Sequence, residues 1–207
     1  MEFKIKNTSV KLSFSFVALV LLFIIGEKSN LYYITFFNTF LHELIHILFI
    51  LVFKGEISEF KISILGGEIK RYDSNISNFQ NAIMYISAPL LNIILGSTFL
   101  LITQQESDFV VSNLALGVFN ILPFYSFDGG CFLKSVLLCF FNENKTEKVI
   151  TAISIIIAIV ITSASIFVII YSKEGTFLII FSLYMIFALI FKKWTLYLII
   201  KCIYCKI

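Results

Sequence analysis

Long runs of apolar residues, separated by short polar segments, restrict what this chain can fold into. Six runs approach or exceed the ~20 residues that a tilted helix needs to cross a bilayer. Hydrophobic residues make up 59% of the 207, whereas water-soluble domains contain about 45–50%. A soluble fold of this size could not bury that much apolar surface, so we predict an integral membrane protein. The predicted spans are Val10–Gly26, Leu31–Phe53, Phe79–Thr103, Phe109–Phe124, Val149–Ser172 and Thr176–Phe191.

The basic residues predict how these spans are oriented. If the N-terminus faces the cytosol, all of the 16 Lys and Arg residues except Lys28 and Lys173 lie on the cytosolic side, as the positive-inside rule expects. After the last span, Trp194 and two tyrosines are mixed with lysines, which predicts a basic interfacial helix over residues 192–207. We therefore expect a multi-pass protein of a bacterial cell membrane, with both termini in the cytosol.

The longest connecting segment, Lys54–Asn78, has the pattern of a β-hairpin. Phe60–Ile64 alternates loosely, Gly66-Gly67 supplies a turn, and Glu68–Tyr72 returns. A charged surface loop explains this segment equally well. The predicted fold class is an all-α integral membrane protein of about six transmembrane helices, with this short β-hairpin between the second and the third.

Two histidines and a glutamate lie in the middle of the second span, in His42-Glu43-Leu44-Ile45-His46. On a helix, residues i and i+4 share one face, so both imidazoles can reach one metal ion. Glu43 is then placed to accept a proton from a metal-bound water. These are the only histidines in the chain, and ionisable residues at membrane depth are costly. A polar contact between helices is the alternative, but we expect a metal site.

A catalytic zinc ion usually has three protein ligands and one open position for water. Asp128, within the segment Asn120–Gly130, is the best candidate for the third ligand. Pro123 breaks the helix that precedes it, and the two glycines that follow Asp128 permit a tight turn. A simple loop at a helix end would have the same pattern, so this segment alone leaves both readings open.

Taken together, these residues resemble the site-2 family of intramembrane metalloproteases. That family combines an H-E-x-x-H helix with a later N-x-x-P-x-x-x-x-D-G segment, which Asn120, Pro123, Asp128 and Gly129 match here. Ala88-Pro89-Leu90-Leu91-Asn92 looks like a further family element, although the family usually has glycine before that proline. The layout is most similar to the stage IV sporulation protein FB branch, whose members release a sigma factor from a membrane-held precursor.

The resemblance implies one Zn²⁺ per chain, with His42, His46 and Asp128 as its ligands and a water in the fourth position. It implies that Glu43 acts as the general base, which takes a proton from that water and passes it to the leaving amine. The implied activity is hydrolysis of peptide bonds in membrane-embedded or membrane-associated substrates. We also expect a possible membrane regulatory partner, a surrounding lipid bilayer and no nucleic acid.

Four further polar residues lie near this constellation in the sequence. Asn120 would either help to stabilise the oxyanion or hold helices together. Asn92 would form a helix–helix hydrogen bond or contact the substrate, rather than bind the metal. Asn38 and Thr39 lie one turn before His42 and could orient its ring.

Two other classes of function compete with proteolysis. An intramembrane metal or proton transporter would be expected to show two repeated halves, and the sequence has a single copy of each motif. A non-catalytic relative acting as a membrane assembly factor is the other, and the intact Glu43 argues against it. We predict a single transmembrane metalloprotease domain over residues 1–207. Its parts are a catalytic core at about 31–130, further helices at 131–191 and the interfacial helix at 192–207.

Overall fold

The structure, a computed structural model, describes residues 2–5, 8–12, 30–55, 57–63, 66–71, 76–172 and 178–191. The chain divides into two compact units, Met1–Leu122 and Pro123–Ile207. The boundary falls at Pro123, the proline that was predicted to break a helix. The interfacial helix over 192–207 lies outside the described residues, and the single-domain organisation stays a prediction.

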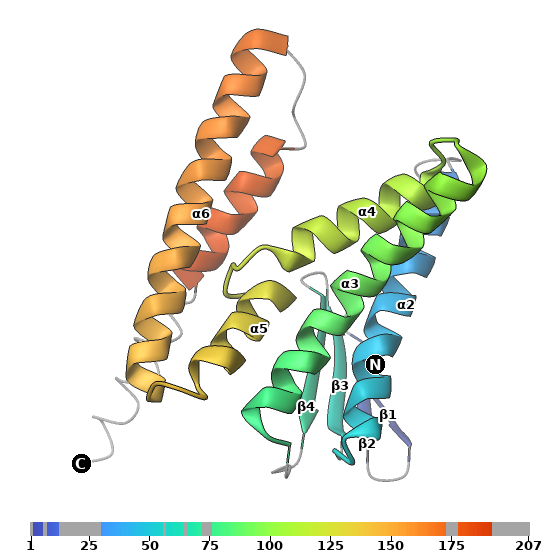
Figure 1. Ribbon diagram of the computed structural model, residues 1–207. Coiled ribbons are helices and arrows are strands. Elements are labelled where there is room, and N and C mark those ends of the chain that lie inside the picture. Colours follow the sequence, from blue (N-terminus) through green and yellow to red (C-terminus); the bar gives the residue numbers. More distant parts are fainter. Residues whose placement is uncertain are drawn as a thin grey trace. The chain divides into compact units, whose positions relative to one another are not determined.

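Three helices of the first unit pack against one another: α2 (Asn30–Val52), α3 (Asn78–Thr103) and α4 (Asp108–Ile121) (Figure 1). They coincide with the second, third and fourth predicted spans to within three residues at each end. The helix α4 ends at Ile121, two residues before Pro123, because proline restricts the residue before it and cannot continue the helical hydrogen bonding.

Helix α2 buries a polar stripe and exposes an apolar surface. Its buried residues recur every four positions and therefore lie on one face: Asn38, His42, His46 and Ile50. Large apolar side chains on its other faces are exposed, among them Phe36, Phe37, Phe40, Leu44, Leu48 and Leu51. This distribution is the reverse of a water-soluble helix and fits a helix whose outer surface meets lipid.

Two glycines let α3 and α4 approach closely. A Cβ atom at Gly96 would lie 2.9 Å from Cγ of Leu114 on α4, and one at Gly117 would lie 2.5 Å from Cγ1 of Ile93 on α3. Small residues at a contact allow helix backbones to come together in a membrane, where packing rather than water exclusion drives association. Short side chains can therefore bridge these two helices.

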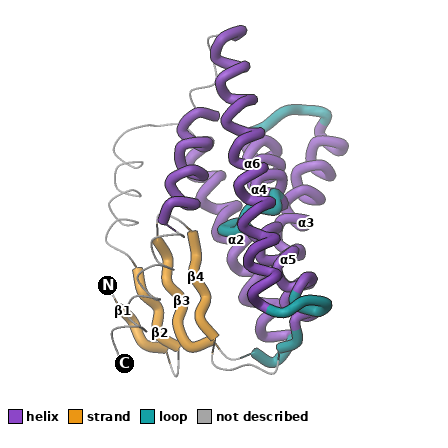
Figure 2. The backbone as a smooth tube through the Cα atoms, turned by 90° about the vertical axis from the view of Figure 1, so that its left-hand side faces the viewer, coloured by secondary structure: helices purple, strands orange, loops and turns teal. Residues whose placement is uncertain are grey.

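A four-stranded sheet also belongs to the first unit, in the order β1-β2-β3-β4 (Figure 2). The strands are β1 (Glu2–Ile5), β2 (Thr8–Leu12), β3 (Ile57–Ser63) and β4 (Gly66–Arg71). The outer pairs β1–β2 and β3–β4 are antiparallel, and β2 runs parallel to β3.

The sheet corrects the sequence prediction in two respects. The β3–β4 pair lies between α2 and α3, where a hairpin was expected, but Gly66 and Gly67 are paired strand residues opposite Ser63 and Ile62 rather than the turn. The N-terminal pair β1–β2 was not predicted, so the all-α description is incomplete. Val10–Leu12 belongs to β2 instead of opening the first span, and the rest of that predicted span, residues 13–26, lies outside the described residues.

The second unit contains α5 (Asp128–Leu137), α6 (Glu143–Ser172) and a helix over Leu178–Phe191. The last two correspond to the fifth and sixth predicted spans. Four buried side chains form the core of this unit: Phe124, Ala158, Met185 and Ala188. Lys134 and Glu147 form an ion pair between α5 and α6.

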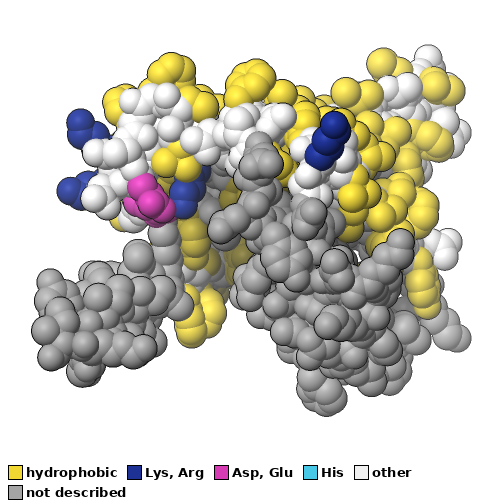
Figure 3. All heavy atoms as spheres, turned by 90° about the horizontal axis from the view of Figure 1, so that it is seen from below, with side chains coloured by type: hydrophobic (Ala, Val, Ile, Leu, Met, Phe, Trp, Pro, Cys, Tyr) yellow, Lys and Arg dark blue, Asp and Glu magenta, His cyan; other side chains and the backbone are white. Residues whose placement is uncertain are grey.

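Among the described residues, three helices are long and apolar enough to cross a membrane: α2, α3 and Glu143–Tyr171 of α6. Two shorter apolar helices, α4 and Leu178–Phe191, accompany them. Hydrophobic side chains cover much of the described surface that is visible from below, and charged side chains are few there (Figure 3). These helices are those of a membrane protein, whereas the count of six spans stays a prediction.

Candidate functional site

The two histidines of the H-E-x-x-H sequence lie on the buried face of α2. His42 and His46 are 5% and 6% exposed, and their ring centroids are 5.0 Å apart, with an angle of 83° between the ring planes. The i, i+4 spacing therefore brings both imidazoles to one face, as the sequence predicted. That face is covered by helices of the first unit.

Both imidazoles are bonded to α3 through the same ring nitrogen. Nδ1 of His42 lies 2.6 Å from Oδ1 of Asn92, and Nδ1 of His46 lies 3.1 Å from the backbone oxygen of Met84. A backbone carbonyl can only accept, so Nδ1 of His46 carries the proton. A neutral imidazole with its proton on Nδ1 has its lone pair on Nε2. These bonds select the tautomer that a histidine needs in order to bind a metal through Nε2.

Asn92 has a bridging position that the sequence only partly predicted. Its Nδ2 donates to Oδ1 of Asn113 on α4 at 2.8 Å, and the side chain is 3% exposed. Both ends of the amide therefore bond to protein groups. This favours the predicted helix–helix role of Asn92, while a contact with substrate stays a prediction.

The two residues of α2 that were expected to orient His42 are hydrogen-bonded to other groups. The hydroxyl of Thr39 donates to the backbone oxygen of Thr35 at 2.8 Å, and Nδ2 of Asn38 donates to Oγ of Ser112 at 2.6 Å. Orientation of the imidazoles comes from α3 instead. Asn113, which accepts a hydrogen bond from Asn92, was missed. A polar side chain within an apolar span was the available signal, because such a group is costly unless it is bonded.

The two remaining predicted residues of the first unit lie on different helices. Glu43 is half-buried and follows His42 directly on α2. Asn120 is half-buried in the last turn of α4. Their roles as general base and as oxyanion donor stay predictions.

Asp128 belongs to the second unit, where it is the first residue of α5 and half-buried. The positive end of the helix dipole favours a carboxylate at this position. The loop reading of this segment was therefore incomplete, because Asp128 begins a helix. Its convergence with the histidines on one metal ion stays a prediction.

The segment that leads to Asp128 is held tightly within the second unit. The backbone N–H of Tyr125 donates to Oγ of Ser154 on α6 at 2.9 Å, and its phenol donates to the backbone oxygen of Ala188. Burial, with Tyr184 as a smaller cause, raises the pKa of Tyr125 to about 12, so the phenol keeps its proton at neutral pH. A Cβ atom at Gly130 would lie only 2.0 Å from the backbone oxygen of Phe124. The position of Asp128 thus depends on Gly130 and on the two hydrogen bonds of Tyr125.

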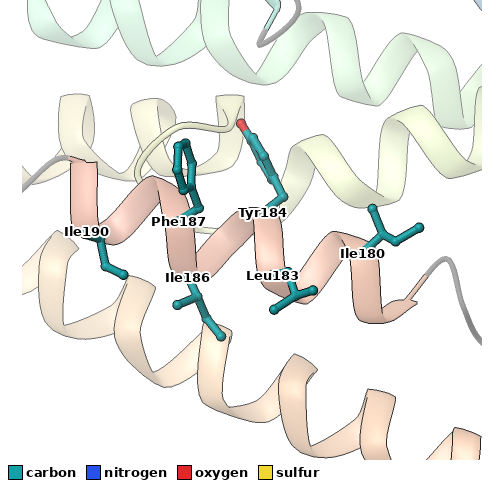
Figure 4. Close-up of a pocket in the computed structure, with 6 residues that line it drawn as sticks. All are labelled: Ile180, Leu183, Tyr184, Ile186, Phe187 and Ile190. Carbon is teal, nitrogen blue, oxygen red and sulfur yellow. The ribbon is translucent and has the colours of Figure 1, made fainter.

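A separate apolar hollow of about 510 Å³ lies along the helix Leu178–Phe191 (Figure 4). Tyr184 and Phe187 point to one side of this helix, whereas Leu183, Ile186 and Ile190 point to the other (Figure 4). Its lining residues are Ile180, Leu183, Tyr184, Ile186, Phe187 and Ile190. None of these side chains is a usual metal ligand or a proton acceptor at neutral pH, so this hollow is not the candidate site.

No protein-family model matches the sequence, and no curated protein matches it either. Among solved structures, the site-2 protease from Methanocaldococcus jannaschii is similar to this chain, with a TM-score of 0.64 and 23% sequence identity. The match covers 91% of this chain and 93% of that one. This chain therefore shares its fold with a site-2 protease.

Proposed function

We propose that this protein is an intramembrane zinc metalloprotease that hydrolyses peptide bonds of membrane-embedded or membrane-associated substrates. One observation carries the proposal. Both imidazoles of an H-E-x-x-H sequence are buried on one face of a membrane-length helix, and each is bonded through Nδ1 to an acceptor on α3. A helix contact alone would not require the same tautomer of both rings. The shared fold with a site-2 protease supports the same reading.

The donor set that we propose for the metal is chemically suited to zinc. His42, His46 and Asp128 each offer one ligand atom, from two imidazoles and one carboxylate. Nitrogen and oxygen donors from three residues, with one open position, are typical of a catalytic zinc site. The acceptors that face Nδ1 of both rings favour the Nδ1-protonated tautomer, whose Nε2 can bind a metal.

Bound zinc would supply a Lewis acid that lowers the pKa of water toward ~7 and polarises the scissile carbonyl. Glu43 accepts one proton from the attacking water, while the oxygen of that water bonds to the carbonyl carbon. Glu43 then delivers this proton to the amine nitrogen as the C–N bond breaks. The amide of Asn120 is proposed to donate a hydrogen bond to the developing oxyanion.

The substrate that we propose is itself a membrane protein, because the histidines lie within a helix of membrane length. Substrate helices hide their amides in internal hydrogen bonds, so a cleaved segment must first unwind. An extended segment could then pair with an outer strand of the four-stranded sheet. We further propose six spans with both termini in the cytosol, and regulated release of a membrane-held transcription factor. The likeness of the motifs to the stage IV sporulation protein FB branch favours a sigma-factor precursor.

The direct test compares Glu43→Gln with the wild type. Both proteins are co-expressed with a panel of single-span membrane proteins that carry tags at both ends, and cleavage is followed by immunoblot. The wild type should cleave at least one panel member, and Glu43→Gln should bind zinc in equal amount but cleave none. Equal cleavage by both proteins would remove Glu43 from the reaction. Failure of both to cleave any member, a pro-sigma factor included, would favour the assembly-factor alternative.

The metal site is tested separately by zinc content. Asp128→Ala should hold less zinc than the wild type, measured by mass spectrometry of protein purified without chelators. Asp108→Ala is the matched control, because Asp108 also lies in the first turn of its helix, α4, and is exposed. Equal zinc in all three proteins would dismiss Asp128 as a ligand.

A further inference from the structure

A chain of hydrogen bonds runs through the buried interior of the first unit, from α2 through α3 to α4. Nδ1 of His42 is bonded to Oδ1 of Asn92, and Nδ2 of Asn92 to Oδ1 of Asn113. Nδ2 of Asn113 in turn donates to the backbone oxygen of Phe109 at 2.9 Å. Asn92 and Asn113 are 3% and 1% exposed, so water does not compete for these bonds.

The direction of every bond in this chain follows from its last member. The oxygen of Phe109 can only accept, so the amide group of Asn113 must present its NH₂ to it and its oxygen to Asn92. Asn92 must then present its NH₂ to Asn113 and its oxygen to His42. Only an N–H can face that oxygen, so the proton of neutral His42 lies on Nδ1. The orientation of an amide is otherwise ambiguous, and here the backbone decides it.

We propose that Asn113 is a positioning residue for the metal site. It fixes the amide of Asn92 in one of its two orientations and thereby holds His42 in the tautomer whose Nε2 can bind a metal. The side chain of Asn113 is hydrogen-bonded to Asn92 and to the backbone oxygen of Phe109, not to the imidazole, so it acts only through Asn92. The inference rests on the proposed metal site and adds to it a residue outside the sequence motifs.

Without Asn113, the amide of Asn92 could turn by about 180° at little cost. Its NH₂ would then face Nδ1 of His42, and Nδ1 would have to accept. The proton would move to Nε2, and a metal could bind there only after displacing it. Residues that orient a ligand typically contribute about 10–100-fold to metal affinity. We expect Asn113→Leu to weaken zinc binding by about tenfold. This is the low end of that range, because Asn113 acts on His42 only through Asn92.

The wild-type protein itself supplies the first test. The chain has only two histidines, so protein labelled with ¹⁵N-histidine and purified with a histidine-free tag shows two imidazoles in its NMR spectrum. At about pH 8, metal-free His42 should show a protonated Nδ1 and an unprotonated Nε2. His46 is the internal reference, because its Nδ1 is held by the backbone oxygen of Met84. A proton on Nε2 of His42 overturns the proposal.

The second test uses two substitutions at Asn113 and a matched control. Asn113→Leu should change the His42 signals, leave those of His46 in place and weaken zinc binding, as measured by competition with a chelator. Asn113→Asp should bind zinc nearly as well as the wild type, because a protonated carboxyl group can donate to the oxygen of Phe109 while its other oxygen accepts from Asn92. Ser112→Ala removes the acceptor of the bond from Nδ2 of Asn38 and a second donor to the oxygen of Phe109. It leaves in place the bonds that join Asn113 to Asn92 and Asn92 to His42, so its affinity should equal that of the wild type.

Equal zinc affinities of Asn113→Leu and Ser112→Ala would overturn the positioning role. If Asn113→Leu does not fold, the wild-type tautomer and the affinity of Asn113→Asp still decide the question. If Asn113→Asp also lost zinc binding, helix packing would be the only role left for Asn113. That result, too, would overturn the positioning role. A wild type that binds no zinc would instead end the proposed function, while the tautomer of His42 would remain measurable.

Discussion

Gly117 on α4 lies directly against the backbone of Pro89 on α3: a Cβ atom at position 117 would lie 2.9 Å from the carbonyl oxygen of Pro89. The absence of a side chain here sets how closely the two helices approach. Asn113 precedes Gly117 by one turn, and Asn92 follows Pro89 by nearly one turn. The 2.8 Å bond between the two asparagines therefore depends on this contact.

Gly117→Val should separate α3 from α4 and weaken both stability and zinc binding. The added side chain must push against the backbone of Pro89 and the side chain of Ile93, and overpacking of this kind costs about 1–3 kcal/mol. The thermal midpoint in detergent measures the stability, and chelator competition measures the affinity. Val118→Leu, at the next and exposed position of α4, should change neither. A stable Gly117→Val protein with normal zinc affinity would contradict this account.

Gly130→Ala should displace Asp128, whereas a substitution at an exposed position of the loop before it should not. A Cβ atom at position 130 would lie 2.0 Å from the backbone oxygen of Phe124, and that backbone cannot yield without moving the first turn of α5. We expect a destabilisation of about 1–3 kcal/mol or more, together with less bound zinc in the purified protein. Ser126→Ala is the control, because Ser126 is exposed in the same loop. Full zinc content in Gly130→Ala would show that Asp128 does not depend on this turn.

Local patterns were sufficient to predict α2, α3, α4 and α6 and the buried face of α2. The i, i+4 spacing of His42 and His46 is a property of one helix, and Pro123 ends α4 by restricting its own neighbours. Neither feature needs knowledge of distant residues. The helix α5 was missed because Asp128-Gly129-Gly130 has the composition of a turn, although its glycines are buried within the first helical turn.

Long-range pairings could not be predicted from the same patterns. The strand β2 pairs in parallel with β3, which follows more than forty residues later, and no local signal specifies such a partner. Asn113 likewise gained its role only through its neighbour Asn92 on α3. Asn38, Asn92 and Asn113 could be recognised in the sequence as polar groups that are costly within apolar spans. The residues to which they would be hydrogen-bonded could not be predicted.

Cys131 should react with maleimide far more slowly than Cys139. Burial, with the charge of Asp128 as the second cause, raises the pKa of the Cys131 thiol to about 11 from its ordinary 9.0, whereas Cys139 is exposed. The thiolate is the reactive form, so at pH 8 its fraction at Cys131 should be about 100-fold below that of an ordinary thiol. Mass spectrometry of a protein in which Cys202 and Cys205 are replaced by Ser measures both rates.

The pH dependence of this reaction has a definite sign. Because the pKa of Cys131 is raised, its labelling rate should climb about tenfold per pH unit through pH 10 without levelling off. Denatured protein is the control, and both cysteines should then react alike. Equal rates in the folded protein would mean that the surroundings of Cys131 do not raise its pKa.

Removal of zinc should lower the thermal stability of the wild type. A metal that binds only the folded state adds about 2.7 kcal/mol when its concentration is 100 times Kd. For a chain of this length that amounts to roughly 5–10 °C in the thermal midpoint. The chelator 1,10-phenanthroline should produce this decrease, and its non-chelating 1,7 isomer should not, because the two differ only in the position of one nitrogen.

Two variants distinguish loss of metal from a direct effect of the chelator. Asp128→Ala should begin with a lower midpoint and should show little further decrease with 1,10-phenanthroline, since it lacks a proposed ligand. Glu43→Gln should respond as the wild type does, because Glu43 is proposed to move a proton and not to bind the metal. If the wild type keeps the same midpoint with both isomers, no stabilising metal joins α2 to Asp128. The buried imidazoles would then have to be explained as contacts between α2 and α3 alone.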